Sequence, residues 1–210
     1  HRRAAVGRVK PVRGILFDKD GTLVDFEATW AALARRMALM AADGDAARAD
    51  VLLRQSGLDP ATGRFRPDSI FAAGTNADVV ELWYPELPRE ELAEKVAMFD
   101  RFTASEGAAS AVALPGVLDA VRSLHGQGYR LGVATTDSTA GAEQTIAALG
   151  VSSCFAAAYG YDAVARPKPA PDVVVAFADL TGLKPAQIAM IGDSRHDLEA
   201  GRAAHAGLVV

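Results

Sequence analysis

Cysteine is nearly absent from this sequence of 210 residues, which contains only Cys154. One cysteine cannot form an internal disulfide, and without a nearby catalytic histidine or asparagine it is expected to be a buried apolar residue. Long hydrophobic runs are also missing. None approaches the ~20 residues that span a bilayer, and none follows the positively charged opening, residues 1–8. We therefore expect a cytoplasmic protein without membrane partners, whose first residues form a disordered tail or a non-native remnant.

An excess of basic charge is absent too. The chain has 22 basic and 26 acidic residues, mixed along the sequence, and a formal net charge of −4. Nucleic acid is therefore not an expected partner, because binding it requires a basic surface that neutralises phosphates. Hydrophobic residues make up 50% of the chain. That fraction suffices for one large domain, or for one domain with a modest insert, in a monomer or a homodimer.

The most informative segment is an acidic turn that directly follows the apolar run of residues 15–17. Its residues are Asp18, Asp20, Gly21 and Thr22. A strand that ends in two carboxylates places them at the carboxyl edge of a sheet, where open α/β folds bind ligands. One carboxylate can attack a substrate while the other transfers a proton. Alone, this turn is a moderately specific signal, because acidic turns with glycine and threonine are common in loops.

The pattern of apolar residues divides the chain into two parts. Residues 25–111 are expected to be all helical, with a loop at residues 57–64 and helices that include residues 30–37, 77–83 and 89–106. From residue 115 onward, helices alternate with short apolar strands. Such alternation predicts an α/β fold, a Rossmann-like, doubly wound parallel sheet covered on both faces. We expect a discontinuous core, residues 1–24 and 112–210, and an inserted helical cap, residues 25–111.

Four polar segments begin where predicted strands end. Because parallel strands present their carboxyl ends at one edge of the sheet, these segments are expected to converge there. They are Asp18-Lys19-Asp20-Gly21-Thr22, Thr135-Thr136-Asp137, Arg166-Pro167-Lys168-Pro169 and Gly192-Asp193-Ser194-Arg195-His196-Asp197.

The order and spacing of these four segments resemble the haloacid dehalogenase superfamily over residues 14–210. The helical segment after the first strand is similar to a C1-type cap, and the nearest resemblance is to phosphoglycolate phosphatase-like members. Members that act on phosphate esters carry an acid two residues after the nucleophile, as Asp20 follows Asp18 here. The resemblance therefore implies phosphate-ester chemistry rather than dehalogenation or phosphonate cleavage.

Asp18 is the predicted nucleophile, which forms an aspartyl-phosphate. Asp20 is the predicted general acid, which protonates the leaving oxygen and then activates water. With Asp193 and Asp197, four carboxylates crowd one cleft, and each pair at ~4 Å costs roughly 1 kcal/mol in water or about 4 at an effective dielectric constant of ~20. A divalent cation relieves this repulsion, and oxygen ligands favour Mg²⁺. The resemblance implies the side chains of Asp18 and Asp193 and the backbone carbonyl of Asp20 as its ligands.

The remaining candidate residues are expected to bind phosphate or to support the site. Lys168 is predicted to neutralise the nucleophile and the phosphoryl oxygens. Asp197 is predicted to orient Lys168 or the metal waters or to cap its helix, and Ser194 either supports the site or caps the same helix. The phosphate-binding set consists of Gly21, Thr22, Thr135, Thr136 and Lys168.

We therefore expect a Mg²⁺-dependent phosphatase that hydrolyses a small phosphorylated metabolite, phosphoglycolate-like or a sugar phosphate. The alternatives are a phosphosugar mutase of the same family and a non-catalytic ligand-binding module. Lys19 occupies a position that is commonly apolar in the family, and it is expected to meet either an anionic substrate or a cap carboxylate such as Glu27. His196 is expected to face solvent.

Overall fold

The computed structural model describes residues 11–210, so the predicted tail at residues 1–8 lies outside the described residues. Its centre is a sheet of five parallel strands in the order β3-β2-β1-β4-β5. The strands are β1 (Gly14–Phe17), β2 (Arg130–Ala134), β3 (Phe155–Tyr159), β4 (Ile188–Ile191) and β5 (Leu208–Val209). From β1 the chain continues to β2 and β3 on one side of β1, and then returns to β4 and β5 on its other side. The strand order therefore reverses between the neighbouring strands β1 and β4.

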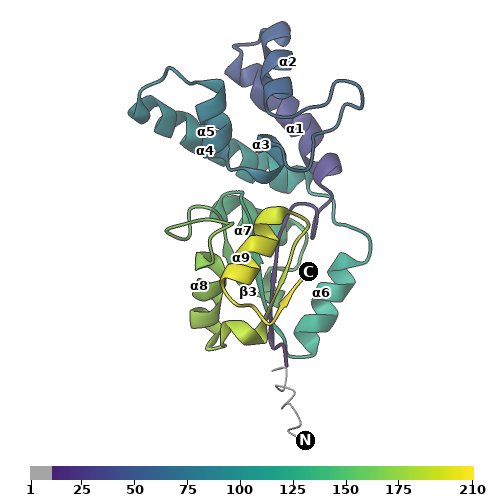
Figure 1. Cartoon of the computed structure of the whole chain (residues 1–210). Coiled ribbons are helices and arrows are strands. Elements are labelled where there is room, and N and C mark those ends of the chain that lie inside the picture. The colour runs from purple at the N-terminus through teal and green to yellow at the C-terminus, as the bar shows by residue number, and fades with distance from the viewer. Residues whose placement is uncertain (1–10) are drawn as a thin grey trace, which may run out of the picture.

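Helices cover both faces of this sheet (Figure 1). The two-residue period of β1 sends Ile15 and Phe17 to one face, where they pack with α6 (Val117–Gly126) and α7 (Thr139–Ala148). Leu16 points to the other face, which α8 (Asp172–Thr181) and α9 (Arg195–Ala203) cover. Both faces of β1 are therefore buried, which confirms the predicted doubly wound α/β fold.

The helical insert, residues 25–111, lies at the carboxyl end of the sheet (Figure 1). It has its own apolar core, built around Trp30, Met37 and Phe99. The loop at residues 57–64 joins its second and third helices, as expected. The helices are α1 (Phe26–Ala41), α2 (Ala46–Gln55), α3 (Ile70–Ala73), α4 (Asn76–Trp83) and α5 (Arg89–Ser110).

Two neighbouring segments, which are hydrogen-bonded to each other, connect the insert to the sheet. The backbone N–H of Asp25 donates to the carbonyl of Val112 at 2.8 Å, and the N–H of Leu114 donates to Leu23 at 3.1 Å. The chain passes between the sheet and the helical insert at these residues. Its division into a core and a cap at residues 24 and 112 stays a prediction. Helix α5 packs against α7, so the insert also rests on the core directly.

Two further features complete the fold. Short 3₁₀ helices at Ser152–Cys154 and Pro185–Gln187 precede β3 and β4, and Cys154 is buried, as expected. Among residues 11–210, no helix is both long enough and apolar enough to cross a bilayer.

Candidate active site

The acidic turn follows β1 directly, at the reversal point of the sheet. The backbone N–H of Asp18 donates to Ile191 of β4 at 2.7 Å, which holds the two strand ends together. Gly21 has a φ of +86°, and a side chain there would begin 2.0 Å from Oδ2 of Asp193. Glycine is thus required twice, by its backbone conformation and by the close approach of Asp193.

Lys168 is a buried cation of the site. Its ammonium donates to Asp18 Oδ1 at 2.6 Å, to the carbonyl of Ala134 at 2.9 Å and to Asp197 Oδ1. These contacts use all three of its N–H groups. Lys168 therefore links the ends of β1 and β2 to the first turn of α9.

Asp197 is fully buried, and both of its oxygens are engaged. Oδ1 accepts from Lys168, and Oδ2 accepts from the hydroxyl of Ser194 at 2.6 Å and from its backbone N–H at 3.1 Å. Ser194 is the N-cap of α9, and the two residues form a capping box. A single arrangement thus caps the helix and orients the carboxylate that holds Lys168.

Asp18, Asp193 and Asp197 present carboxylate oxygens that lie within 4.8 Å of one another. Since Lys168 and Ser194 occupy both oxygens of Asp197, the donors left for a cation are on Asp18 and Asp193. Such a set of hard oxygen donors suits Mg²⁺.

The electrostatics of the cluster also favour a cation. Burial, together with repulsion from neighbouring carboxylates, raises the pKa of Asp18 from its ordinary value of 3.8 to about 7, although Lys168 opposes the shift. Partial desolvation and the charge of Asp197 raise the pKa of Asp193. Burial disfavours the charge of Lys168, but the two carboxylates it contacts outweigh that effect and raise its pKa. The carboxylates therefore carry uncompensated repulsion that a bound divalent ion would relieve.

The second strand supplies the threonine pair. Thr135 is buried, and its Oγ1 accepts a hydrogen bond from the backbone N–H of Asp137 at 3.1 Å. Thr136 is partly exposed and lines a small cavity that also contacts Asp20. Thr22 is half-buried in the turn after Gly21. The structure thus gathers the predicted site residues at one edge of the sheet, as their strand positions required.

A larger cavity, of about 450 Å³, lies between this edge and the helical insert. Asp20, Asp193 and Ser194 line it from the core. The insert contributes residues of α1 and of the loop before α3, among them Phe26, Glu27, Arg64 and Arg66. A small organic ligand fits a cavity of this size.

A model of the haloacid dehalogenase-like hydrolases matches residues 12–205. The chain belongs to that family. The phosphoglycolate phosphatase of Salmonella typhimurium strain LT2 is 30% identical over 219 residues, which cover 94% of this chain and 80% of the relative. The phosphoglycolate phosphatase of Escherichia coli strain K12 is 29% identical over 211 residues, 95% of this chain and 81% of the relative.

The fold is shared with solved structures as well. The structure of a predicted phosphoglycolate phosphatase from Haemophilus somnus aligns with a TM-score of 0.67 at 24% identity, covering 93% of this chain and 83% of the other. Family and relatives together identify the enzyme class of this haloacid dehalogenase-like hydrolase as phosphoric monoester hydrolase.

The expectation for Lys19 was wrong where it named Glu27. Lys19 is 1% exposed, and its ammonium pairs with Asp20 at 2.8 Å and with Asp137 at 3.1 Å. Glu27 instead accepts from the backbone N–H of Phe65 at 3.3 Å. A buried ammonium needs counter-charges within reach, and the carboxylates of Asp20 and Asp137, in the turns after β1 and β2, are nearer than that of Glu27 in the insert.

The expectation that His196 faces solvent was also wrong. The ring is half-buried, and its Nδ1 donates to the carbonyl of Ala73 in α3 at 3.1 Å. His196 sits in the first turn of α9, which lies close to the end of α3 in the insert. This hydrogen bond connects α9 of the core to α3 of the insert near the larger cavity.

Sequence reasoning assigned no catalytic role to two residues that contact the site. Asp137 ends the threonine segment and pairs with Lys19, and Trp30 of α1 donates its indole N–H to Asp20 at 2.5 Å. The position of Asp137 shortly after β2 was a usable signal, because the acids that follow β1 and β4 were singled out. Trp30 followed the apolar pattern of α1, which carries no information about its N–H group.

Proposed function

We propose that this chain is a Mg²⁺-dependent phosphatase that hydrolyses a small phosphorylated metabolite, phosphoglycolate-like or a sugar phosphate, through an aspartyl-phosphate at Asp18. The observation that carries the proposal is the ammonium of Lys168, shared by Asp18 and Asp197, with Asp193 beside them. A cation and several acids at one point suit an anionic substrate that is attacked by a carboxylate.

In the first step, a carboxylate oxygen of Asp18 attacks the phosphorus atom. The new bond between that oxygen and phosphorus forms as the bond from phosphorus to the leaving oxygen breaks, and Asp20 gives its proton to the leaving oxygen. In the second step, Asp20 takes a proton from water while the water oxygen attacks the phosphorus of the intermediate. The bond to Asp18 then breaks, which releases inorganic phosphate and restores both carboxyl groups.

The phosphoryl group would be held by groups from three strand ends. Lys168 supplies positive charge, and Thr135, with the backbone N–H of Thr136, supplies hydrogen bonds from the end of β2. Gly21 and Thr22 complete the phosphate-binding set from the turn after β1. Negative charge develops on the phosphoryl oxygens during transfer, and donors that are already fixed in place lower the activation barrier most when they face that charge.

The metal would be held by the side chains of Asp18 and Asp193 and by the backbone carbonyl of Asp20. When bound, Mg²⁺ neutralises the phosphate and the attacking carboxylate, so that two anions can approach each other. Asp197 would act through Lys168, because both of its oxygens are already engaged.

The test is phosphate release from a panel of small esters, including 2-phosphoglycolate, sugar phosphates and nucleoside monophosphates, with Mg²⁺ or with EDTA. We expect release that requires Mg²⁺ and favours one ester. Interconversion of sugar phosphate isomers without phosphate release would contradict a hydrolase in favour of a mutase. Mg²⁺ binding without any turnover would leave only a binding module.

A further inference from the structure

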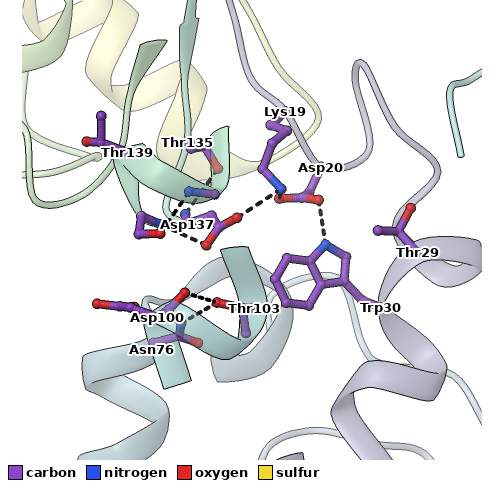
Figure 2. Close-up of polar contacts among 12 residues, drawn as sticks. Lys19, Asp20, Thr29, Trp30, Asn76, Asp100, Thr103, Thr135, Asp137 and Thr139 are labelled. Carbon is purple, nitrogen blue, oxygen red and sulfur yellow. Dashed lines mark hydrogen bonds and ion pairs between the residues drawn. The ribbon is translucent and has the colours of Figure 1, made fainter. Parts of the chain in front are cut away.

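The candidate general acid, Asp20, is held at both of its carboxylate oxygens (Figure 2). The indole N–H of Trp30 donates to Oδ1 at 2.5 Å, and the ammonium of Lys19 contacts Oδ2 at 2.8 Å. Two contacts on opposite oxygens fix the rotation of the carboxyl plane, which one contact would leave free. Each oxygen keeps a second lone pair for the proton that Asp20 is proposed to transfer.

Lys19 is itself fixed in place. Its side chain is 2% exposed, its ammonium also contacts Asp137 Oδ2 at 3.1 Å, and the ring of Trp30 lies 5.1 Å from the ammonium. Asp137 in turn accepts from the backbone N–H of Ser138 at 2.7 Å. A buried ion pair with these constraints has one geometry, so the position of Asp20 is set by residues from the turns after β1 and β2 and from α1.

We propose that Lys19 and Trp30 are positioning residues that aim Asp20 at the leaving oxygen, with Asp137 holding Lys19. This inference rests on the proposed function, because it assigns Asp20 a proton to transfer. Trp30 is the member that comes from the helical insert. Proton transfer by Asp20 is therefore coupled to the placement of α1 over the sheet.

If these contacts had only a structural role, their loss would lower kcat/KM to a similar extent for alkyl and aryl phosphate esters. General acid catalysis matters most when the leaving oxygen is strongly basic, as in an alkyl phosphate, and least when it leaves as a stable phenolate. The value of kcat/KM reports only the steps up to release of the alcohol, before water attacks the intermediate. The ratio of kcat/KM for an alkyl ester to that for an aryl ester thus isolates the contribution of Asp20 as an acid.

The first experiment compares Trp30→Phe with Trp83→Phe at saturating Mg²⁺. Trp83 is a matched control, since it is also a buried tryptophan of the insert and its indole N–H donates to Ser56 at 2.7 Å. For Trp30→Phe, we expect kcat/KM to fall about 10- to 100-fold with the alkyl ester that the panel favours and less than about threefold with p-nitrophenyl phosphate. For Trp83→Phe, the ratio of the two values stays that of the wild type.

A second variant tests Lys19 without leaving a buried charge alone. Lys19→Met combined with Asp137→Asn removes both partners of the inner ion pair, which is milder than removing one. We expect the same selective loss with the alkyl ester. An unchanged ratio in both Trp30→Phe and the double variant would overturn the positioning role, provided that the wild type hydrolyses both esters. A wild type that hydrolyses no ester of the panel would overturn the proposed function, and the inference with it.

Discussion

Gly21 and Asp193 meet at the point where the metal is proposed to bind. Replacement of Gly21 by alanine would put Cβ 2.0 Å from an oxygen of Asp193 and force the carboxylate to move. We expect Gly21→Ala to raise the Mg²⁺ concentration for half-maximal activity about 10-fold or more. It would also lower the free energy of unfolding by about 1–2 kcal/mol, because a residue with a side chain resists a φ of +86°.

Gly150 provides the control for that substitution. Its φ is +67°, and nothing lies within 4 Å of the position that a Cβ would take. Gly150→Ala should therefore cost similar stability and leave the Mg²⁺ dependence of activity unchanged. Equal Mg²⁺ dependence in the two variants would show that Asp193 does not bind the metal.

Residue identities at this edge were predictable because each one follows a strand. Asp18, Lys168 and Asp193 occupy positions that parallel strands must bring together, whatever the details of packing. The partners of long side chains were not predictable in this way. From the sequence, Lys19 can reach carboxylates at the sheet edge or on the insert. Only the folded structure, in which its buried ammonium lies at the turns after β1 and β2, shows that the partners are Asp20 and Asp137.

At the scale of elements, the residue that caps α9 also contacts a residue of the site. Ser194 caps this helix and donates to the same Asp197 that holds Lys168. Ser194→Ala should lower the free energy of unfolding by about 1 kcal/mol. It should also lower kcat severalfold, because Asp197 loses a donor that fixes its orientation. Urea unfolding and steady-state kinetics on one preparation measure both effects.

Asp45→Ala is the matched control for a capping effect alone. Asp45 caps α2, accepts from the N–H groups of Ala47 and Arg48, and lies in the insert away from the sheet edge. It should cost similar stability with kcat unchanged. If the two variants lowered kcat equally, the loss would come from weaker folding rather than from Asp197.

Sequence patterns predicted the core strands and all helices except α2 and α3. For α1, α5, α6 and α8 the prediction came from apolar residues at helical spacing. Helix α2 buries only Ala49, Leu52 and Leu53, and the short α3 buries only Phe71. Both lie within a segment that was expected to be helical as a whole, and neither was predicted as a separate helix.

At the scale of the whole molecule, the buried acids make stability depend on pH. The pKa of Asp18 rises from 3.8 to about 7 on folding, so the folded state binds the additional proton between those values. Stability without metal should therefore fall as pH rises through this window, by on the order of 4 kcal/mol. The raised pKa values of Asp137 and Asp193 act in the same direction. Those of Lys19 and Lys168 lie above their ordinary value of 10.5, so their contribution stays constant there.

Urea unfolding in EDTA at about pH 5 and about pH 8 measures this dependence. Asp18→Asn should lose much of the fall, because its amide carries no charge to desolvate. Adding Mg²⁺ should stabilise the wild type more at the higher pH, where Asp18 is ionised. If the free energy of unfolding of Asp18→Asn fell by the same amount between these pH values, the pH dependence would come from the other buried acids and not from Asp18.

The proposed aspartyl-phosphate is tested most directly by mass spectrometry of the peptide that contains residue 18, after acid quench during turnover of p-nitrophenyl phosphate with Mg²⁺. Asp20→Asn is the variant of choice, because an aryl group leaves without an acid while water attack on the intermediate slows. We predict one phosphoryl group on Asp18, together with a burst of p-nitrophenol close to one equivalent of enzyme, and neither in Asp18→Asn. Sustained turnover with no phosphoryl group on Asp18, or with one on another residue, would contradict the proposed chemistry.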